Sequence, residues 1–150
     1  MMKKNKIILG ALFILIILLS GGIFYWKKMT VREEVLISNN ISLGNCNINI
    51  ETVATDELRE KGLAGRDSLC QNCGMLFLFD KKEKHYFWMK GMRFSIDMVW
   101  LVDNKVVDIN KNINQQSKKV YSSKEKVNKV LELNAHDADR CGIKIGDKLK

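Results

Sequence analysis

One long segment without a charged side chain limits what the N-terminal part of this 150-residue chain can become. It runs from Ile7 to Trp26 and consists mostly of Ile, Leu, Phe and Ala. Twenty helical residues rise about 30 Å, which matches the hydrocarbon thickness of a bilayer. The aromatic residues that end the segment are typical of a membrane interface. The segment therefore predicts a transmembrane signal-anchor helix.

The orientation of this helix follows from its flanks. The basic residues on the two sides are nearly balanced: Lys3, Lys4 and Lys6 precede the segment, and Lys27, Lys28 and Arg32 follow it. A first helix followed by one globular domain usually sends that domain across the membrane. We therefore expect a single-pass membrane protein with an extracytoplasmic domain. The alternative is a secreted protein, cleaved near the small residues Ser20, Gly21 and Gly22.

The charge of the chain does not indicate nucleic-acid binding. The net charge is +8, but five of the 25 basic residues lie in positions 1–28, where no acidic residue occurs. The remainder has 20 basic and 17 acidic residues, a balance of +3. The excess belongs mostly to the membrane flanks, and no basic stripe with interleaved aromatic residues is visible. We expect residues 1–28 to be the anchor, 29–44 a tether and 45–150 one domain.

The domain reads as mainly β, in the α+β class. Alternating apolar residues from Cys46 to Glu51 predict a half-buried strand. Thr55 predicts the start of a short helix that Gly62 ends, and a second short helix is expected from Ala135 to Cys141. Further strands are expected at these ranges: 75–79 and 85–89, paired as a hairpin, 95–102 and 105–109, paired as a second hairpin, and 127–133. Together they predict a small antiparallel β-barrel or curved sheet with two short helices, behind one transmembrane helix.

Several short motifs occur in a recognisable order. They are Gly62 to Arg66 (GLAGR), Gly74 to Phe79 (GMLFLF), Phe87 to Lys90 (FWMK), Ile96 to Met98 (IDM), Val130 to Ala135 (VLELNA) and Gly142 to Asp147 (GIKIGD). With these motifs, the stretch from Cys46 to Leu149 resembles domain of unknown function 192. The resemblance implies a small barrel-like domain, often exported, without an established activity. The family usually has Pro before the Ile-Asp pair, whereas this chain has Ser95 there and contains no Pro.

The four cysteines favour disulfides, because their number is even and the domain is expected outside the cytoplasm. Three connectivities are possible among Cys46, Cys70, Cys73 and Cys141. The Cys-x-x-Cys spacing of Cys70 and Cys73 also fits half of a zinc site or a redox-active dithiol. Neither alternative has a second supporting motif in the sequence. We expect no metal and no cofactor.

Asp97 is the most informative polar residue, because it lies in a strand of bulky apolar residues. A buried carboxylate needs a charged partner or several hydrogen bonds. The candidates are an ion pair with Arg66 or Lys90, a set of N–H groups from loops, or a role in a functional site.

Two hypotheses for function follow. The first is a non-enzymatic binding or accessory module, for an unknown small-molecule or protein ligand, with a pocket lined by Arg66, Trp88, Lys90, Asp97 and Glu132. Trp88 and Lys90 share one strand face and would supply an aromatic platform beside a cation. The second is an extracytoplasmic hydrolase or lyase that uses Asp97 and Glu132 as acid and base. His85 and His136 are weak signals, and we expect each at the surface or at a cap.

Overall fold

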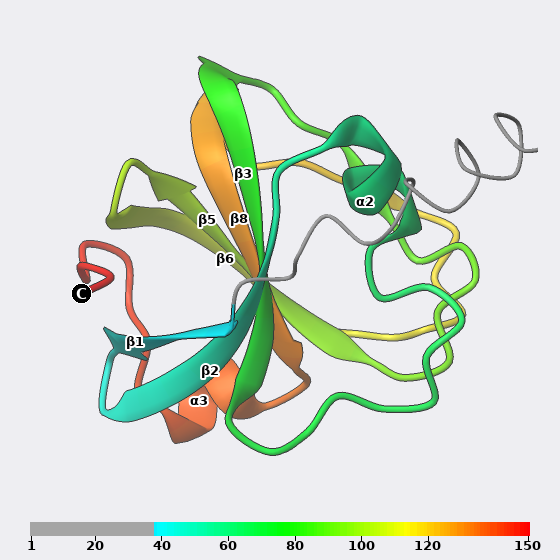
Figure 1. Ribbon diagram of the computed structural model, residues 1–150, viewed down its shortest axis with the longest axis horizontal. Coiled ribbons are helices and arrows are strands. Elements are labelled where there is room, and N and C mark those ends of the chain that lie inside the picture. The colour runs from blue at the N-terminus through cyan, green and yellow to red at the C-terminus, as the bar shows by residue number, and fades with distance from the viewer. Residues whose placement is uncertain (1–37) are drawn as a thin grey trace, which may run out of the picture. The chain divides into compact units, whose positions relative to one another are not determined.

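The computed structural model describes residues 38–150, called the domain below (Figure 1). The predicted signal-anchor helix lies outside these residues. Within the domain, no helix is both long and apolar enough to cross a membrane. The first strand begins at Ser38, inside the segment that was predicted to be a tether.

Six strands form one curved sheet in the order β1-β2-β3-β8-β5-β6 (Figure 1). Their bounds are β1 Ser38–Leu43, β2 Cys46–Val53, β3 Cys73–Glu83, β8 Val127–Asn134, β5 Ile96–Val102 and β6 Lys105–Ile113. All neighbouring pairs are antiparallel except β2 and β3, which are parallel. The prediction of a mainly β fold with two short helices is confirmed. The prediction of a wholly antiparallel sheet is wrong, because β2 and β3 are parallel.

The parallel pair results from a crossover through helix α2 (Asp56–Lys61). The side chain of Thr55 accepts a hydrogen bond from the Leu58 N–H, which starts the helix. Gly62 ends it with a φ of 47°, a conformation that favours glycine. Both predicted helix limits are confirmed. Because α2 lies between the two strands along the chain, β3 can return to the sheet beside β2 and run parallel to it.

The predicted hairpin of residues 75–79 and 85–89 is wrong. Strand β3 pairs with β2 and β8, while β4 (Phe87–Trp88) pairs with β7 (Val120–Tyr121) in a separate two-stranded sheet. The start of β3 is buried on both faces, so it occupies a central position between two long strands. The second predicted hairpin, β5 with β6, is confirmed.

The sheet is not closed into a barrel, so the curved-sheet alternative is the correct one. Its edge strands β1 and β6 are not paired with each other. The C-terminal segment lies against both edges instead. Ser42 of β1 exchanges two backbone hydrogen bonds with Lys150, of 2.8 and 3.0 Å, and the Val106 N–H of β6 donates to Asp147 at 2.9 Å. These contacts use backbone groups that a closed barrel would need for direct strand pairing.

The sheet separates two apolar cores, because successive side chains of each strand point to opposite faces. The first core contains Leu76, Val99 and Leu131 and is covered by helix α3 (Asp137–Arg140) and the C-terminal segment. The second core contains residues of the alternate parity, including Met75, Phe77, Met98, Trp100 and Val130. The second face is the one that carries the candidate site.

Candidate functional site

A pocket of about 320 Å³ lies on the second face. It is lined by α2 and the turn after it, by the end of β3, by residues 85–92, and by Glu132 of β8. A volume of this size is at the lower end of the range for small-molecule sites.

Glu132 is the most buried polar residue of this pocket, with 5% of its surface exposed. The strand register places it opposite Met75 of β3 and Met98 of β5, so its two cross-strand neighbours are apolar. Within the described domain, its side chain has no hydrogen-bond or ion-pair partner. Burial raises the pKa of Glu132 to about 8. The pocket therefore contains a carboxyl group whose hydrogen-bonding capacity is unused.

Aromatic rings form the wall beside this carboxyl. Phe87 packs edge-to-face against Phe77 and Phe79, with ring centroids 5.0 and 6.4 Å apart. The His85 ring stacks on Phe79 at a centroid distance of 3.5 Å. The Nε2 atom of His85 is buried and has no hydrogen-bond partner within the domain. The pocket thus has two polar groups without protein partners, set among aromatic surfaces.

Trp88 and Lys90 lie at the mouth of the pocket. Trp88 is 56% exposed and Lys90 is exposed, whereas Met89 between them is buried. The predicted division of this segment into two faces is therefore confirmed. Of the five predicted site residues, Trp88, Lys90 and Glu132 line one pocket.

Arg66 does not reach this pocket. Its Nη1 and Nη2 atoms donate to the two carboxylate oxygens of Glu51, at 2.8 and 2.7 Å. The hydrogen bond from Arg66 lowers the pKa of Glu51, and the same bond raises the pKa of Arg66. The predicted pairing of Arg66 with Asp97 is wrong, because this two-pronged bond to Glu51 occupies the guanidinium.

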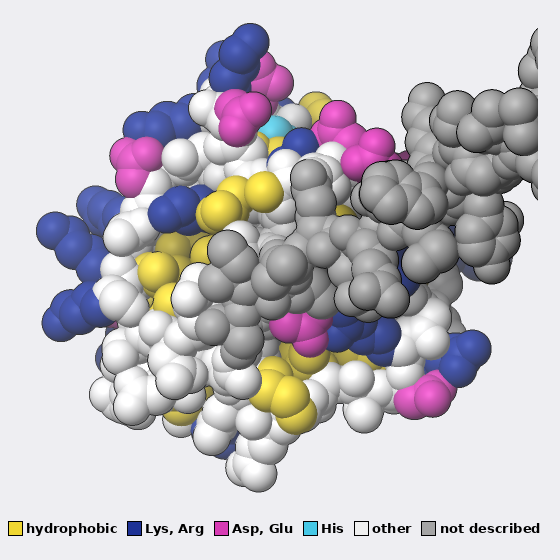
Figure 2. Space-filling model, in the orientation of Figure 1, with side chains coloured by type: hydrophobic (Ala, Val, Ile, Leu, Met, Phe, Trp, Pro, Cys, Tyr) yellow, Lys and Arg dark blue, Asp and Glu magenta, His cyan; other side chains and the backbone are white. Residues whose placement is uncertain are grey.

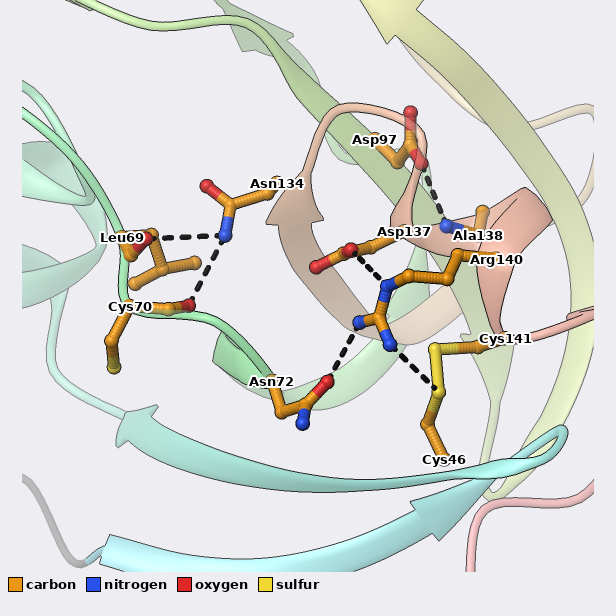
Figure 3. Close-up of polar contacts among 10 residues, drawn as sticks. All are labelled: Cys46, Leu69, Cys70, Asn72, Asp97, Asn134, Asp137, Ala138, Arg140 and Cys141. Carbon is orange, nitrogen blue, oxygen red and sulfur yellow. Dashed lines mark hydrogen bonds and ion pairs between the residues drawn. A yellow bond between two sulfur atoms is a disulfide. The ribbon is translucent and has the colours of Figure 1, made fainter.

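Asp97 holds the backbone of two distant segments. It is fully buried, and its carboxylate accepts hydrogen bonds from the Asn112 N–H at 2.7 Å and from the Ala138 N–H at 2.8 Å. Figure 3 shows the bond to Ala138, at the first turn of α3. Of the predicted alternatives, backbone N–H groups are the ones observed.

Asp97 and Glu132 lie on opposite faces of the sheet. Glu132 stands opposite Met98, whereas Asp97 stands opposite Leu133, the next residue along β8. Neighbouring residues of a strand point to opposite faces. The predicted acid–base pair of Asp97 and Glu132 is therefore not formed.

We expect Asp97→Ala to destabilise the domain by about 3 kcal/mol, because the N–H groups of Asn112 and Ala138 lose a fully buried acceptor. Urea unfolding of the domain measures the loss. Asp80→Ala is the matched control, since Asp80 is an exposed carboxylate on β3. A loss as small as that of Asp80→Ala would contradict a structural role for Asp97.

The four cysteines form two disulfides, Cys46–Cys141 and Cys70–Cys73. This is one of the three connectivities that the sequence left open, and it leaves no free thiol among the four cysteines. Among the described residues, no group of three or more His, Cys, Asp or Glu could hold a metal ion.

Arg140 connects the surroundings of the two disulfides (Figure 3). Its Nε donates to Asp137 at 2.9 Å, its Nη2 to Asn72 at 2.7 Å, and its Nη1 contacts the Cys46 sulfur at 3.5 Å. Because Asn72 lies inside the short Cys70–Cys73 loop, this guanidinium ties that loop to α3 and to the first disulfide.

The sequence interpretation missed His85 and Arg59. His85 shares its strand parity with Phe87 and Met89, which point inward, and this signal could have placed its ring inside the fold. Arg59 of α2 lies over the Phe79 ring at 5.1 Å and donates to the Leu78 carbonyl at 2.6 Å. No local pattern indicates these partners, because α2 and β3 meet only in the folded chain.

Comparison with known proteins gives a consistent family match. The model of a family described as "Uncharacterized ACR" matches residues 39–150. A solved structure from Sinorhizobium meliloti 1021, of a protein proposed to be a transcription regulator, is 29% identical, with a TM-score of 0.74 over 79% of this chain and 96% of that chain. A protein of unknown function from Novosphingobium aromaticivorans DSM 12444 is 27% identical, with a TM-score of 0.68 over 74% of this chain and 81% of that chain. No curated protein matches the chain.

The match to the Sinorhizobium protein also has a practical consequence. It accounts for almost the whole of that protein, which therefore forms this fold with little additional chain. The described residues, 38–150, all belong to one compact unit. The domain is therefore a suitable object for solution experiments.

Proposed function

The chain belongs to the uncharacterised DUF192 family, and we propose that it is a membrane-held extracytoplasmic binding module. Its ligand would enter the pocket that Glu132 lines, called the Glu132 pocket below. The observation that carries the proposal is the Glu132 carboxyl, which is buried in the pocket and has no partner within the domain. A buried polar group without a partner is destabilising, so such groups mark sites where a ligand supplies the missing interaction.

The pocket combines the features of a small-molecule site. Aromatic side chains contribute to its wall, and Glu132 and His85 line it together with charged residues of α2 and Lys90. Trp88 and Lys90 at the mouth add an exposed indole and a flexible cation. This differs from the five-residue pocket expected from the sequence, since Arg66 and Asp97 are engaged elsewhere.

Two features support the extracytoplasmic location. The uncharged segment from Ile7 to Trp26 is long enough to anchor the chain in a membrane. Two disulfides in one small domain favour an oxidising compartment. We extend the proposal to a single-pass topology with the domain outside, and a secreted form after cleavage is the alternative.

We do not extend the regulator description of the Sinorhizobium protein to this chain. On the face seen in Figure 2, several basic side chains gather along the left edge and others stand beside acidic ones, and no continuous basic stripe crosses the face. A nucleic-acid surface needs a continuous basic patch or stripe. The charge balance of the sequence outside the membrane flanks, +3, agrees with this.

A fragment screen on the domain tests the proposal. Two-dimensional amide NMR with a chemically mixed set of small molecules should give binders that shift resonances of residues 85–92 and of Glu132. Ala64→Phe should abolish this binding, because Ala64 lines the pocket and the ring would fill it. Ala54→Phe is the matched control, since Ala54 is exposed and lies outside the pocket.

Binders that map to another surface, or binders that survive Ala64→Phe, would contradict the assignment of this pocket. A screen without any binder at these residues would contradict the proposal as a whole. Both readouts need only the folded domain, and neither depends on the membrane location.

A further inference from the structure

We propose that the Glu132 pocket binds a small organic cation, with the ammonium group between the aromatic wall and the Glu132 carboxylate. The inference rests on the proposed function and gives its ligand a chemical class. Three observations carry it: the aromatic wall, the position of the carboxyl and the distribution of charge around the pocket.

The aromatic wall offers ring faces to a cation. Phe79, Phe87 and Trp88 line the pocket together with the ring of His85. The negative face of an aromatic ring attracts a cation within about 6 Å of its centroid. The Phe79 ring is already covered in this way, since the Arg59 guanidinium lies 5.1 Å from its centroid and the His85 ring stacks on it, so the exposed indole of Trp88 is the ring that remains open to a ligand. The pocket is thus suited to a positive group.

The carboxyl supplies the counter-charge at the buried end. Glu132 has no cation within the domain to pair with, and its strand neighbours Met75 and Met98 cannot donate hydrogen bonds. An ammonium group would provide both the charge and the N–H or polarised C–H donors that are missing. An anionic ligand would instead meet an acidic group at the same place.

The other charged groups around the pocket do not supply this counter-charge. On α2, Arg59 pairs with Asp56 at 2.6 Å, and the neighbouring Glu60 and Lys61 are exposed. Lys90 on the opposite side is exposed at the mouth, so it can remain in solvent when a cation enters. Glu132 is therefore the one buried acidic group among the residues that line the pocket, while the half-buried Arg59 is paired with Asp56.

Binding of a cation should be coupled to the loss of one proton. Burial raises the pKa of Glu132 to about 8, so the carboxyl is mostly protonated at neutral pH. The ammonium form of the ligand favours the carboxylate, and the proton passes to the solvent. Affinity should therefore rise about tenfold per pH unit up to pH 8 and level off above it. A neutral ligand that accepts a hydrogen bond from the protonated carboxyl would show the opposite trend.

The experiment compares choline with its neutral carbon isostere, 3,3-dimethylbutan-1-ol, by NMR titration of the domain. At about pH 9 we expect choline to bind at the pocket at least tenfold more tightly than the isostere. In Glu132→Gln the difference should shrink at least severalfold, since the amide keeps the shape and removes the charge while the aromatic wall remains. Glu57→Gln is the matched control, because Glu57 is an exposed carboxylate of α2 outside the pocket.

The outcomes separate this inference from the proposed function. Equal or tighter binding of the isostere at the pocket would overturn the cation assignment, and a preference for choline that is undiminished in Glu132→Gln would overturn the placement of the cation against Glu132; either result leaves a binding pocket in place. Absence of choline binding, together with fragment-screen binders at the same residues, would also overturn the cation assignment. Absence of every binder at these residues would overturn the proposed function itself.

Discussion

The free energy of unfolding of the domain should fall by about 4 kcal/mol between pH 4.5 and pH 8, and Glu132→Gln should remove most of this fall. The expectation follows from burial, which raises the pKa of Glu132 from 4.5 to about 8. Between these pH values the folded state holds one proton that the unfolded state has released. Stability therefore decreases as pH rises, by about 1.4 kcal/mol per unit. The contribution becomes constant about one pH unit below 4.5 and about one unit above 8.

Urea unfolding at a series of pH values measures the effect, with Glu57→Gln as the exposed control. The lowered pKa of Glu51 acts in the opposite direction, because its ion pair is lost as pH falls below the ordinary range of Glu. That contribution lies mainly below pH 4.5, so it does not mask the slope at higher pH. Parallel curves for the wild type and Glu132→Gln would show that Glu132 is hydrated or paired, and would remove the observation on which the proposed function rests.

The parts of the fold that local patterns specify were predictable. The β5–β6 hairpin follows from two apolar runs joined by the turn at Asp103 and Asn104, and it is confirmed. Helix α2 follows from Thr55 at its start and Gly62 at its end. In each case the residues that decide the structure are adjacent in the chain, so the sequence contains the complete signal.

The pairing of β3 was not predictable in the same way. The charged residues after Phe79 favour a short connection, which suggested a hairpin with the next apolar run. The strand instead pairs with β2 and β8, whose residues lie far away in the sequence. Burial of both faces of β3 outweighs the local hairpin, because a central strand contributes apolar contacts on each side.

In the candidate site, too, local sequence patterns indicate which residues are buried, but not which distant groups they contact. An apolar strand around Asp97 indicates burial correctly, but its partners are the backbone N–H groups of Asn112 and Ala138. A backbone group has no residue type that a sequence pattern could reveal. For Glu132, the alternation of side chains along the strand predicted that it points to the opposite face from Leu131 and Leu133. Its position between Met75 and Met98 depends on the register of three strands, which no local pattern indicates.

The Cys46–Cys141 disulfide should contribute most of the stability that the cysteines provide. The two cysteines are separated by 95 positions, so the bond closes almost the whole domain, whereas Cys70 and Cys73 are separated by three. The entropy of loop closure in the unfolded chain then predicts a contribution of about 4.7 kcal/mol for the long loop and about 1.9 kcal/mol for the short one. The folded geometry favours the long closure as well, since the Asn45 N–H of the β1–β2 turn donates to the Cys141 carbonyl at 2.8 Å.

The measurement is urea unfolding of two double variants, Cys46→Ala/Cys141→Ala and Cys70→Ala/Cys73→Ala, each against the wild type. The short-loop variant is the matched control, because it removes the same number of sulfur atoms and the same kind of bond. We expect the long-loop variant to lose about 3 kcal/mol more than the control. Equal losses in the two variants would mean that loop length does not govern their effect, and that contacts such as those of Arg140 with Asn72 and Cys46 stabilise both disulfide regions to the same degree.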